Sequence, residues 1–97
     1  MRNLAEIREI LRQHKAELAE KFKVKELSIF GSYARGEATP ESDLDILVEF
    51  SEPISLFRFL ELEEYLSQLL GVRVELVSRA ALKPHIGEAI LRERIPV

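Results

Sequence analysis

The sequence predicts an α+β fold, in which a short mixed β-sheet is flanked by helices. Segments with the apolar spacing of a helix alternate with short apolar runs typical of strands, in the order helix, strand, short helix, strand, helix, strand, helix. The chain has 97 residues, which is enough for one modest core and leaves no room for a separate substrate domain. We therefore expect residues 1–97 to form a single domain.

The first element is expected to be an amphipathic helix over residues 3–20. Apolar residues recur there at helical spacing, and the stripe consists of Leu4, Ile7, Leu11 and Leu18. His14 falls on the same stripe, and we interpret it as a histidine at the edge of a core-facing helix rather than as a ligand or base. Residues 25–30 form an apolar run that stops at Gly31, as a strand ending in a turn does.

A short helix, a polar loop and a second strand are expected next. Ser32 is well placed to cap a helix that ends at Arg35, and residues 36–42 have the composition of a surface loop. A strand is expected from Asp43 to Phe50, with alternate side chains on opposite faces of the sheet. Because the connection to this strand is short, the first two strands need not be parallel neighbours.

The second half of the chain is expected to add a helix, a strand and a helical tail. A helix over about residues 55–70 ends at Gly71, and its apolar stripe comprises Leu56, Phe59, Leu62 or Leu60, Leu66 and Leu69. A third strand is expected over residues 72–77. Residues 79–94 are expected to hold one or two short helices, and residues 95–97 a short edge strand. Three apolar residues of this tail are expected to face inward, namely Ile86, Ile90 and Leu91.

Composition and charge exclude several classes of function. The chain has no cysteine, which excludes disulfides, thiolate metal sites and a cysteine nucleophile. Its net charge of −3 disfavours binding to an extended nucleic-acid backbone, although metal ions could screen the charge of a single nucleotide. No apolar run approaches the length of a membrane span or a signal peptide, so we expect a cytoplasmic protein without membrane association.

Two aspartates at the start of the second strand are candidate metal ligands. Asp43 and Asp45 are two residues apart, so both carboxylates project from one face with their Cα atoms about 6.5–7 Å apart. Such a pair can converge on two cations, and oxygen-only ligation selects Mg²⁺ or Mn²⁺. Without a cation the two charges would repel each other. An Asp-x-Asp pair by itself is more often the solvated start of a strand.

The turn at Gly31 and Ser32 strengthens this interpretation. A glycine lets the backbone approach a ligand closely, a helix start presents N–H groups to an anion, and the Ser32 hydroxyl can bind the same phosphate. The spacing of a P-loop is missing. A phosphate-binding turn eleven residues before a metal-binding pair provides the two halves of a nucleoside-triphosphate site.

A third acidic group is needed to complete a metal shell or to accept a proton from the attacking hydroxyl. Glu75 is the best candidate because a carboxylate inside an apolar strand is costly unless it is exposed or paired. The alternative is an exposed strand face that it shares with Arg73. Glu49 lies about 13 Å along the strand from Asp45, which is too far to share an ion. Arg35 could neutralise phosphate charge or pair with a nearby acid such as Glu37 or Asp43.

Together these motifs resemble the minimal nucleotidyltransferase (MNT) family of the polymerase-beta-like nucleotidyltransferase superfamily. The resemblance covers about residues 25–78 and rests on Gly31-Ser32-Tyr33-Ala34-Arg35-Gly36, on Ser42-Asp43-Leu44-Asp45 and on a later acidic residue in a strand. It implies a mixed sheet flanked by helices and two Mg²⁺ ions. The implied reaction transfers a nucleoside monophosphate, most simply AMP from ATP, to a hydroxyl and releases pyrophosphate.

The resemblance also implies roles for individual residues. Gly31 and Ser32 would hold the triphosphate, and Asp43 and Asp45 would bridge the metal ions. The third carboxylate of the family falls at Glu75, where the family more often has aspartate. Glutamate is one methylene longer and could still bind a metal or act as base after a small adjustment.

Small members of this family often act as antitoxins encoded beside a helical HEPN ribonuclease toxin, whose tyrosine they adenylylate. Since the chain has no space for an acceptor-binding domain, we expect the acceptor to be a separate protein of this type. Two alternatives stay open: an antitoxin that neutralises its partner by contact alone, and a nucleotidyltransferase for a small molecule such as an aminoglycoside, which would need a dimer to build its pocket. The sequence leaves open the nucleotide preference, the number of nucleotides transferred and whether the chain forms a homo-oligomer.

Overall fold

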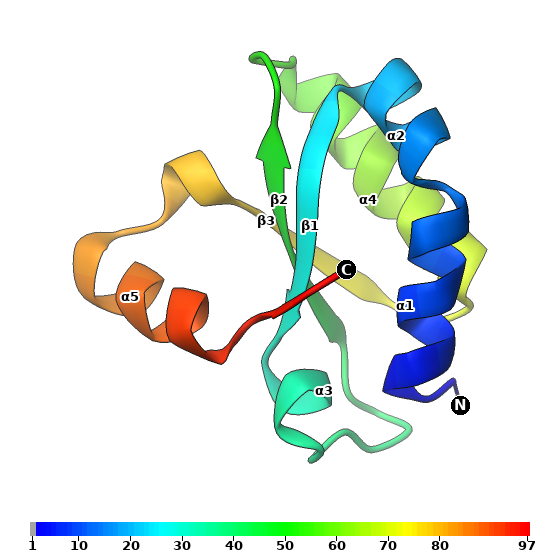
Figure 1. Cartoon of the computed structure of the whole chain (residues 1–97), viewed down its shortest axis with the longest axis vertical. Coiled ribbons are helices and arrows are strands. Elements are labelled where there is room, and N and C mark those ends of the chain that lie inside the picture. Colours follow the sequence, from blue (N-terminus) through cyan, green and yellow to red (C-terminus); the bar gives the residue numbers. More distant parts are fainter. Residues whose placement is uncertain (1) are drawn as a thin grey trace.

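The computed structural model describes residues 2–97 (Figure 1). In this range the chain forms a four-stranded sheet, five α-helices and one 3-10 turn. The elements in chain order are α1 (Leu4–Gln13), α2 (Lys15–Phe22), β1 (Val24–Phe30), α3 (Ser32–Arg35), β2 (Leu44–Phe50), α4 (Leu56–Leu70), β3 (Val74–Ser78), the 3-10 turn η1 (Arg79–Ala81), α5 (Pro84–Glu93) and β4 (Ile95–Pro96). None of the helices in residues 2–97 is long and apolar enough to cross a membrane.

The sheet is mixed, with strand order β3-β2-β1-β4. The connection through α3 stays at one end of the strands, so β2 returns antiparallel to β1, and β4 is also antiparallel to β1. The connection from β2 to β3 passes through α4 and makes these two strands parallel, as a helical crossover allows. The predicted fold class, a mixed sheet flanked by helices, is confirmed.

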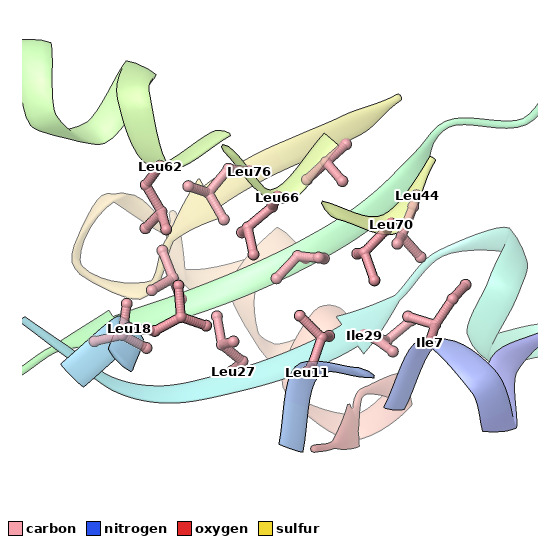
Figure 2. Close-up of a cluster of buried hydrophobic side chains, with 14 of the residues drawn as sticks. Ile7, Leu11, Leu18, Leu27, Ile29, Leu44, Leu62, Leu66, Leu70 and Leu76 are labelled. Atoms are coloured by element: carbon pink, nitrogen blue, oxygen red, sulfur yellow. The ribbon is translucent and has the colours of Figure 1, made fainter. Parts of the chain in front are cut away.

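Helices α1, α2 and α4 cover one side of the sheet, and α5 lies on the other side (Figure 1). The core fills the space between helices α1, α2 and α4 and the strands (Figure 2). Ten side chains there have no exposed surface: Ile7, Leu11, Leu18, Ile29, Leu44, Ile46, Val48, Leu62, Leu66 and Leu70. Burial of large aliphatic side chains contributes about 1.5–3 kcal/mol each, so this layer holds β1 and β2 in register.

The N-terminal helix is divided, which corrects the prediction of one helix over residues 3–20. The break is at His14, which ends α1 and precedes α2. Its ring nitrogen Nδ1 lies 2.8 Å from the Ile10 carbonyl oxygen, which an uninterrupted helix would offer to the backbone N–H of His14. The backbone N–H of His14 instead donates to Leu11 O at 3.1 Å. The predicted apolar stripe holds in both halves.

Helix α4 ends at Gly71 as predicted, begins with an N-cap at Ser55 that was not predicted, and buries a stripe that matches the predicted one only in part. The Ser55 hydroxyl accepts a hydrogen bond from the Arg58 N–H, and Gly71 ends the helix with φ 68°. Leu62, Leu66 and Leu70 are fully buried, as the four-residue spacing of one helix face requires. The predicted positions Leu56 and Leu60 are 70% and 49% exposed. They lie on the neighbouring face beside Phe57, which is 79% exposed.

Two polar side chains of α4 fix the position of β3. The Glu63 carboxylate accepts the Leu76 N–H at 2.9 Å, and the Ser67 hydroxyl accepts the Val74 N–H at 3.0 Å. Because β3 is an edge strand, these N–H groups have no neighbouring strand to pair with. The helix therefore fixes the strand that carries Glu75, which lies between these two residues.

Candidate active site

Asp45 and Glu75 lie side by side on adjacent strands. In the parallel pairing of β2 with β3 the two residues are direct partners, and on its other side Asp45 is paired with Phe30 of β1. Paired residues on strands about 4.8 Å apart project from the same face of the sheet. The fold thus brings together two acidic residues that the sequence analysis selected separately. Asp43 precedes β2 by one residue and is partly exposed.

The Gly31 turn packs directly on the Asp45 carboxylate. Gly31 is buried, with φ 74° and ψ −151°, a backbone region that only glycine adopts readily. A Cβ built on it would overlap Asp45 Oδ2 and lie 3.0 Å from the Asp45 Cγ. Glycine is therefore required twice, for its backbone angles and for the space that the carboxylate occupies. The proposed phosphate-binding and metal-binding halves of the site touch at this point.

The short helix α3 differs from the prediction at its first residue. Gly31 is the N-cap, Ser32 is the first helical residue, and no side-chain hydrogen bond caps this helix. The Ser32 hydroxyl is therefore not used as a cap, and its side chain is partly exposed. Tyr33 is 5% exposed and belongs to the core, as expected for a packing residue. Gly36 ends the turn with φ 74°.

Arg35 forms ion pairs with two glutamates, one in the loop after α3 and one at the end of α5. Its Nε donates to Glu37 Oε1 at 2.7 Å, and its Nη1 donates to Glu93 Oε1 at 2.7 Å. The hydrogen bond that Arg35 donates to Glu37 is the main reason that the pKa of Arg35 is raised. Pairing with Glu37 was one of the predicted alternatives, whereas the contact with Glu93 was not foreseen. The guanidinium stays at the edge of the Gly31 turn, where it could also meet a phosphate.

Glu93 is the residue of this site that sequence reasoning missed. Its Oε1 accepts the Gly31 N–H at 2.9 Å in addition to its bond from Arg35. It comes from the last residue of α5, 62 positions after Gly31. Within the sequence it stands between Arg92 and Arg94, a pattern typical of a solvated helix end. No local spacing signals that it reaches the turn.

Other carboxylates of this region act on Asp45. The pKa of Asp45 is raised to about 6, first by burial, then by the charge of Glu75 and then by that of Asp43. Arg35 opposes this shift and Glu93 adds to it. A divalent cation would relieve such repulsion, and carboxylate oxygens are the ligands that Mg²⁺ prefers. The donor set fits the predicted metal, and Asp43, Asp45 and Glu75 are the residues that could hold it.

The carboxylates of Asp43, Asp45 and Glu75 do not converge on a single metal position in this structure. Across residues 2–97 no three acidic or imidazole groups lie close enough together to hold a metal ion as they stand. Asp45 and Glu75 share one face of the sheet, so rotation of their side chains is sufficient to change their separation. The assignment of the three carboxylates as metal ligands stays a prediction.

A hollow of about 340 Å³ opens beside Asp45 and Glu75. It lies between the sheet and the C-terminal segment, and its lining residues are Phe30, Asp45, Glu75, Val77, Ala81, Leu82, Lys83, Ile86 and Ile90. Ile86 is 62% exposed, which corrects the prediction that it faces inward. The hollow is therefore largely apolar on its walls and carries two carboxylates at one side.

A larger hollow of about 920 Å³ lies at the other end of β2 and contains neither aspartate of the pair. Glu49 and Arg79 line it and form an ion pair at 3.1 Å. Glu49 is thus engaged away from Asp45, as its predicted distance requires. Arg79 points to Glu49, so this structure gives it no contact with the candidate site.

Comparison with known proteins agrees with the geometry. Residues 11–97 match the family described as nucleotidyltransferase domain. The protein adenylyltransferase MntA of Thermococcus cleftensis is 55% identical over 97 residues, which cover 100% of this chain and 98% of that protein. The chain belongs to the nucleotidyltransferase family. It is therefore an enzyme that transfers nucleotidyl groups, and the resemblance noted in the sequence is confirmed.

Solved structures of nucleotidyltransferases share the fold. One assigned as a minimal nucleotidyltransferase has a TM-score of 0.77 and 40% identity, covering 94% of this chain and 95% of that chain. A toxin–antitoxin structure with AMP-PNP has a TM-score of 0.74 at 22% identity, covering 88% of this chain and 69% of that one. A complex of tri-AMPylated Shewanella oneidensis HEPN toxin with its MNT antitoxin has a TM-score of 0.68 at 19% identity, covering 93% and 70%. The last two likenesses concern the fold alone.

Proposed function

We propose that this nucleotidyltransferase is a metal-dependent protein adenylyltransferase, which transfers AMP from ATP to a tyrosine hydroxyl of a partner HEPN ribonuclease toxin and so acts as its antitoxin. The observation that carries the proposal is the packing of the Gly31 turn on Asp45, with Glu75 as the direct partner of Asp45. One site thereby contains a turn suited to phosphate and carboxylates suited to metal.

The reactants have separate places in this proposal. The triphosphate lies at Gly31, Ser32 and Arg35, where a backbone N–H, a hydroxyl and a guanidinium can donate to its oxygens. Asp43, Asp45 and Glu75 would hold Mg²⁺, and this ion when bound would supply neutralisation of the phosphate charge and polarisation of the phosphoryl group.

The acceptor enters through the hollow of about 340 Å³ between the sheet and the C-terminal segment. Its apolar walls, which include Leu82, Ile86 and Ile90, suit the ring of a tyrosine, and Glu75 lines the same hollow. The hydroxyl oxygen bonds to the α-phosphorus, the bond from that phosphorus to the pyrophosphate oxygen breaks, and Glu75 accepts the hydroxyl proton. The products are an adenylylated tyrosine and pyrophosphate.

Three further facts support a protein acceptor. A full-length relative with 55% identity is named a protein adenylyltransferase, and the fold recurs in complexes of antitoxins with HEPN toxins. The chain offers a shallow, open hollow at the carboxylates rather than an enclosed pocket for a small molecule. The surface of a second protein would complete such a site.

Incubation with α-labelled ATP, Mg²⁺ and the HEPN toxin proposed as the partner tests the proposal. Label should appear on the partner and should be absent when the partner's acceptor tyrosine is replaced by phenylalanine. The double variant Asp43→Asn with Asp45→Asn should transfer no label and should no longer neutralise the toxin. If the double variant still neutralises, contact alone is sufficient and the catalytic account of neutralisation is wrong.

A further inference from the structure

The Glu93 carboxylate binds to two of the three donors that the proposed function assigns to the triphosphate. Its Oε1 accepts from the Gly31 N–H at 2.9 Å and from Arg35 Nη1 at 2.7 Å. Both bonds are charge-assisted, and Arg35 and a carboxylate form one of the stronger pairs found in proteins. A phosphate oxygen between a backbone amide and an arginine would have the same surroundings. Glu93 thus provides an internal anion at the phosphate-binding turn.

The two anions exclude each other. The Gly31 N–H is a single donor, and it cannot point at Glu93 Oε1 and at a phosphate oxygen in different places. The charge of Glu93 also lies near the reacting region, because the Gly31 turn to which Glu93 binds packs directly on the Asp45 carboxylate. A triphosphate arriving at the turn would therefore meet both an occupied donor and a like charge.

Glu93 can leave the turn without unfolding its helix. The backbone beyond it is held by strand pairing, because Ile95 pairs with Ile29 and the Val97 N–H donates to Leu27 O at 3.0 Å. The side chain of Glu93 is 27% exposed, so it has access to solvent from its present position. Rotation about its side-chain bonds is enough to free the Gly31 N–H and Arg35.

We propose that Glu93 competes with the triphosphate for Gly31 and Arg35 and thereby sets the affinity of the enzyme for ATP. The proposal rests on the proposed function in one respect, namely that the triphosphate binds at this turn. It opposes the other role open to Glu93, in which the carboxylate holds Arg35 in place for phosphate. The two roles predict opposite effects when Glu93 is removed.

Isothermal titration of ATP with Mg²⁺ into the full chain and its variants separates these roles. Glu93→Ala should lower the Kd for ATP about fivefold or more, because the donors are released. Glu93→Asp keeps the charge but is one methylene shorter, so it should also lower the Kd. Glu37→Ala is the matched control, since Glu37 pairs with Arg35 but makes no bond to Gly31, and its Kd should stay within about twofold.

Three results would overturn the competition. An unchanged or higher Kd in Glu93→Ala means that Glu93 positions Arg35. A lower Kd in Glu93→Ala with a wild-type Kd in Glu93→Asp means that charge alone acts. If Glu37→Ala lowers the Kd for ATP as much as Glu93→Ala does, release of Arg35 alone explains the gain in affinity, and the Gly31 N–H has no part in it.

Two further probes locate the effect. Tripolyphosphate should gain affinity in Glu93→Ala as ATP does, whereas adenosine should show no gain, because the competition concerns phosphate alone. Equal gains for adenosine would contradict the proposal. The labelling of the partner by wild-type enzyme tests the proposed function separately, so an enzyme that transfers AMP but shows no Glu93 effect overturns only this inference. Thermal unfolding confirms folding of each variant, and Glu93→Asp carries the test if Glu93→Ala is unfolded.

Discussion

The Asp45 carboxylate lies in the space that a side chain at Gly31 would occupy. This contact joins two segments that are separated by the whole of α3 and the loop after it. It makes the identity of residue 31 a condition for the position of residue 45. The first prediction follows from it.

Replacing Gly31 with alanine should destabilise the fold and abolish transfer. The substitution forces a Cβ onto Asp45 Oδ2 and places alanine at φ 74° and ψ −151°. The expected loss is more than about 3 kcal/mol in the free energy of unfolding, measured by urea denaturation. Gly36→Ala is the control, because Gly36 also has φ 74° but a Cβ there meets nothing within 4 Å. It should lose only about 1 kcal/mol, and equal losses for both variants would show that the carboxylate contact is unimportant.

Replacing Asp45 with asparagine should stabilise the protein at neutral pH while abolishing transfer. The folded-state pKa of Asp45 is raised to about 6 from 3.8, so ionisation is less favourable in the folded protein than in the unfolded one. The folded state therefore binds the proton more tightly, and stability falls as the pH rises from below 3.8 to above 6. Asparagine does not ionise, so the variant should not show this fall in the free energy of unfolding as the pH rises.

Urea denaturation from pH 3.5 to 8 in the presence of EDTA measures this effect. Asp45→Asn should exceed wild type in free energy of unfolding above pH 6 and should lose the excess as the pH falls toward 4. Glu88→Gln, at an exposed position of α5, controls for the loss of one negative charge. An asparagine variant less stable than wild type at pH 7.5 would contradict the account of Asp45.

Glu75 should matter for transfer because of its place beside Asp45, and Glu49 should not. Glu75→Ala should reduce the rate of labelling at least about 100-fold, whereas Glu75→Asp should retain measurable activity because a carboxylate remains at the site. Glu49→Gln, at the other end of β2, should stay within about threefold of wild type because Glu49 pairs with Arg79. Equal labelling rates for Glu75→Ala and wild type would show that Glu75 has no role in the transfer reaction.

The bond from α4 to β3 should be measurable in stability. Glu63→Ala leaves the Leu76 N–H of the edge strand without its acceptor, which should cost about 1–3 kcal/mol in the free energy of unfolding. Glu63→Gln keeps an oxygen acceptor of the same length and should cost less than half as much. A matched loss in both variants would mean that the negative charge, not the hydrogen bond, stabilises β3.

The elements could largely be predicted because their signals are local. The alternation from Leu44 to Phe50 fixed the faces of β2, and Gly71 marked the end of α4. The burial of α4 was only partly predictable, since apolar residues lie on more than one of its faces and the sequence cannot tell which face meets the sheet. The break at His14 depends on a ring nitrogen reaching the Ile10 carbonyl, which residue spacing does not reveal.

The residues of the candidate site likewise differ in how far the sequence alone could predict them. Gly31, Asp43 and Asp45 were found from short motifs, whereas Glu75 could be selected only by its chemistry until the pairing of β2 with β3 placed it beside Asp45. Glu93 could not be found at all, because its contacts with Gly31 and Arg35 span 62 and 58 residues. Local patterns identify the parts of such a site, and long-range register decides which of them meet.

The mass of the partner toxin after co-expression tests the central claim most directly. With the wild-type chain, the toxin should gain one or more AMP groups on tyrosine and should be inactive as a ribonuclease. With the Asp43→Asn and Asp45→Asn double variant, the toxin should keep its unmodified mass and its activity. An unmodified toxin that is nevertheless inactive beside the wild-type chain would contradict the claim that this protein acts by adenylylation.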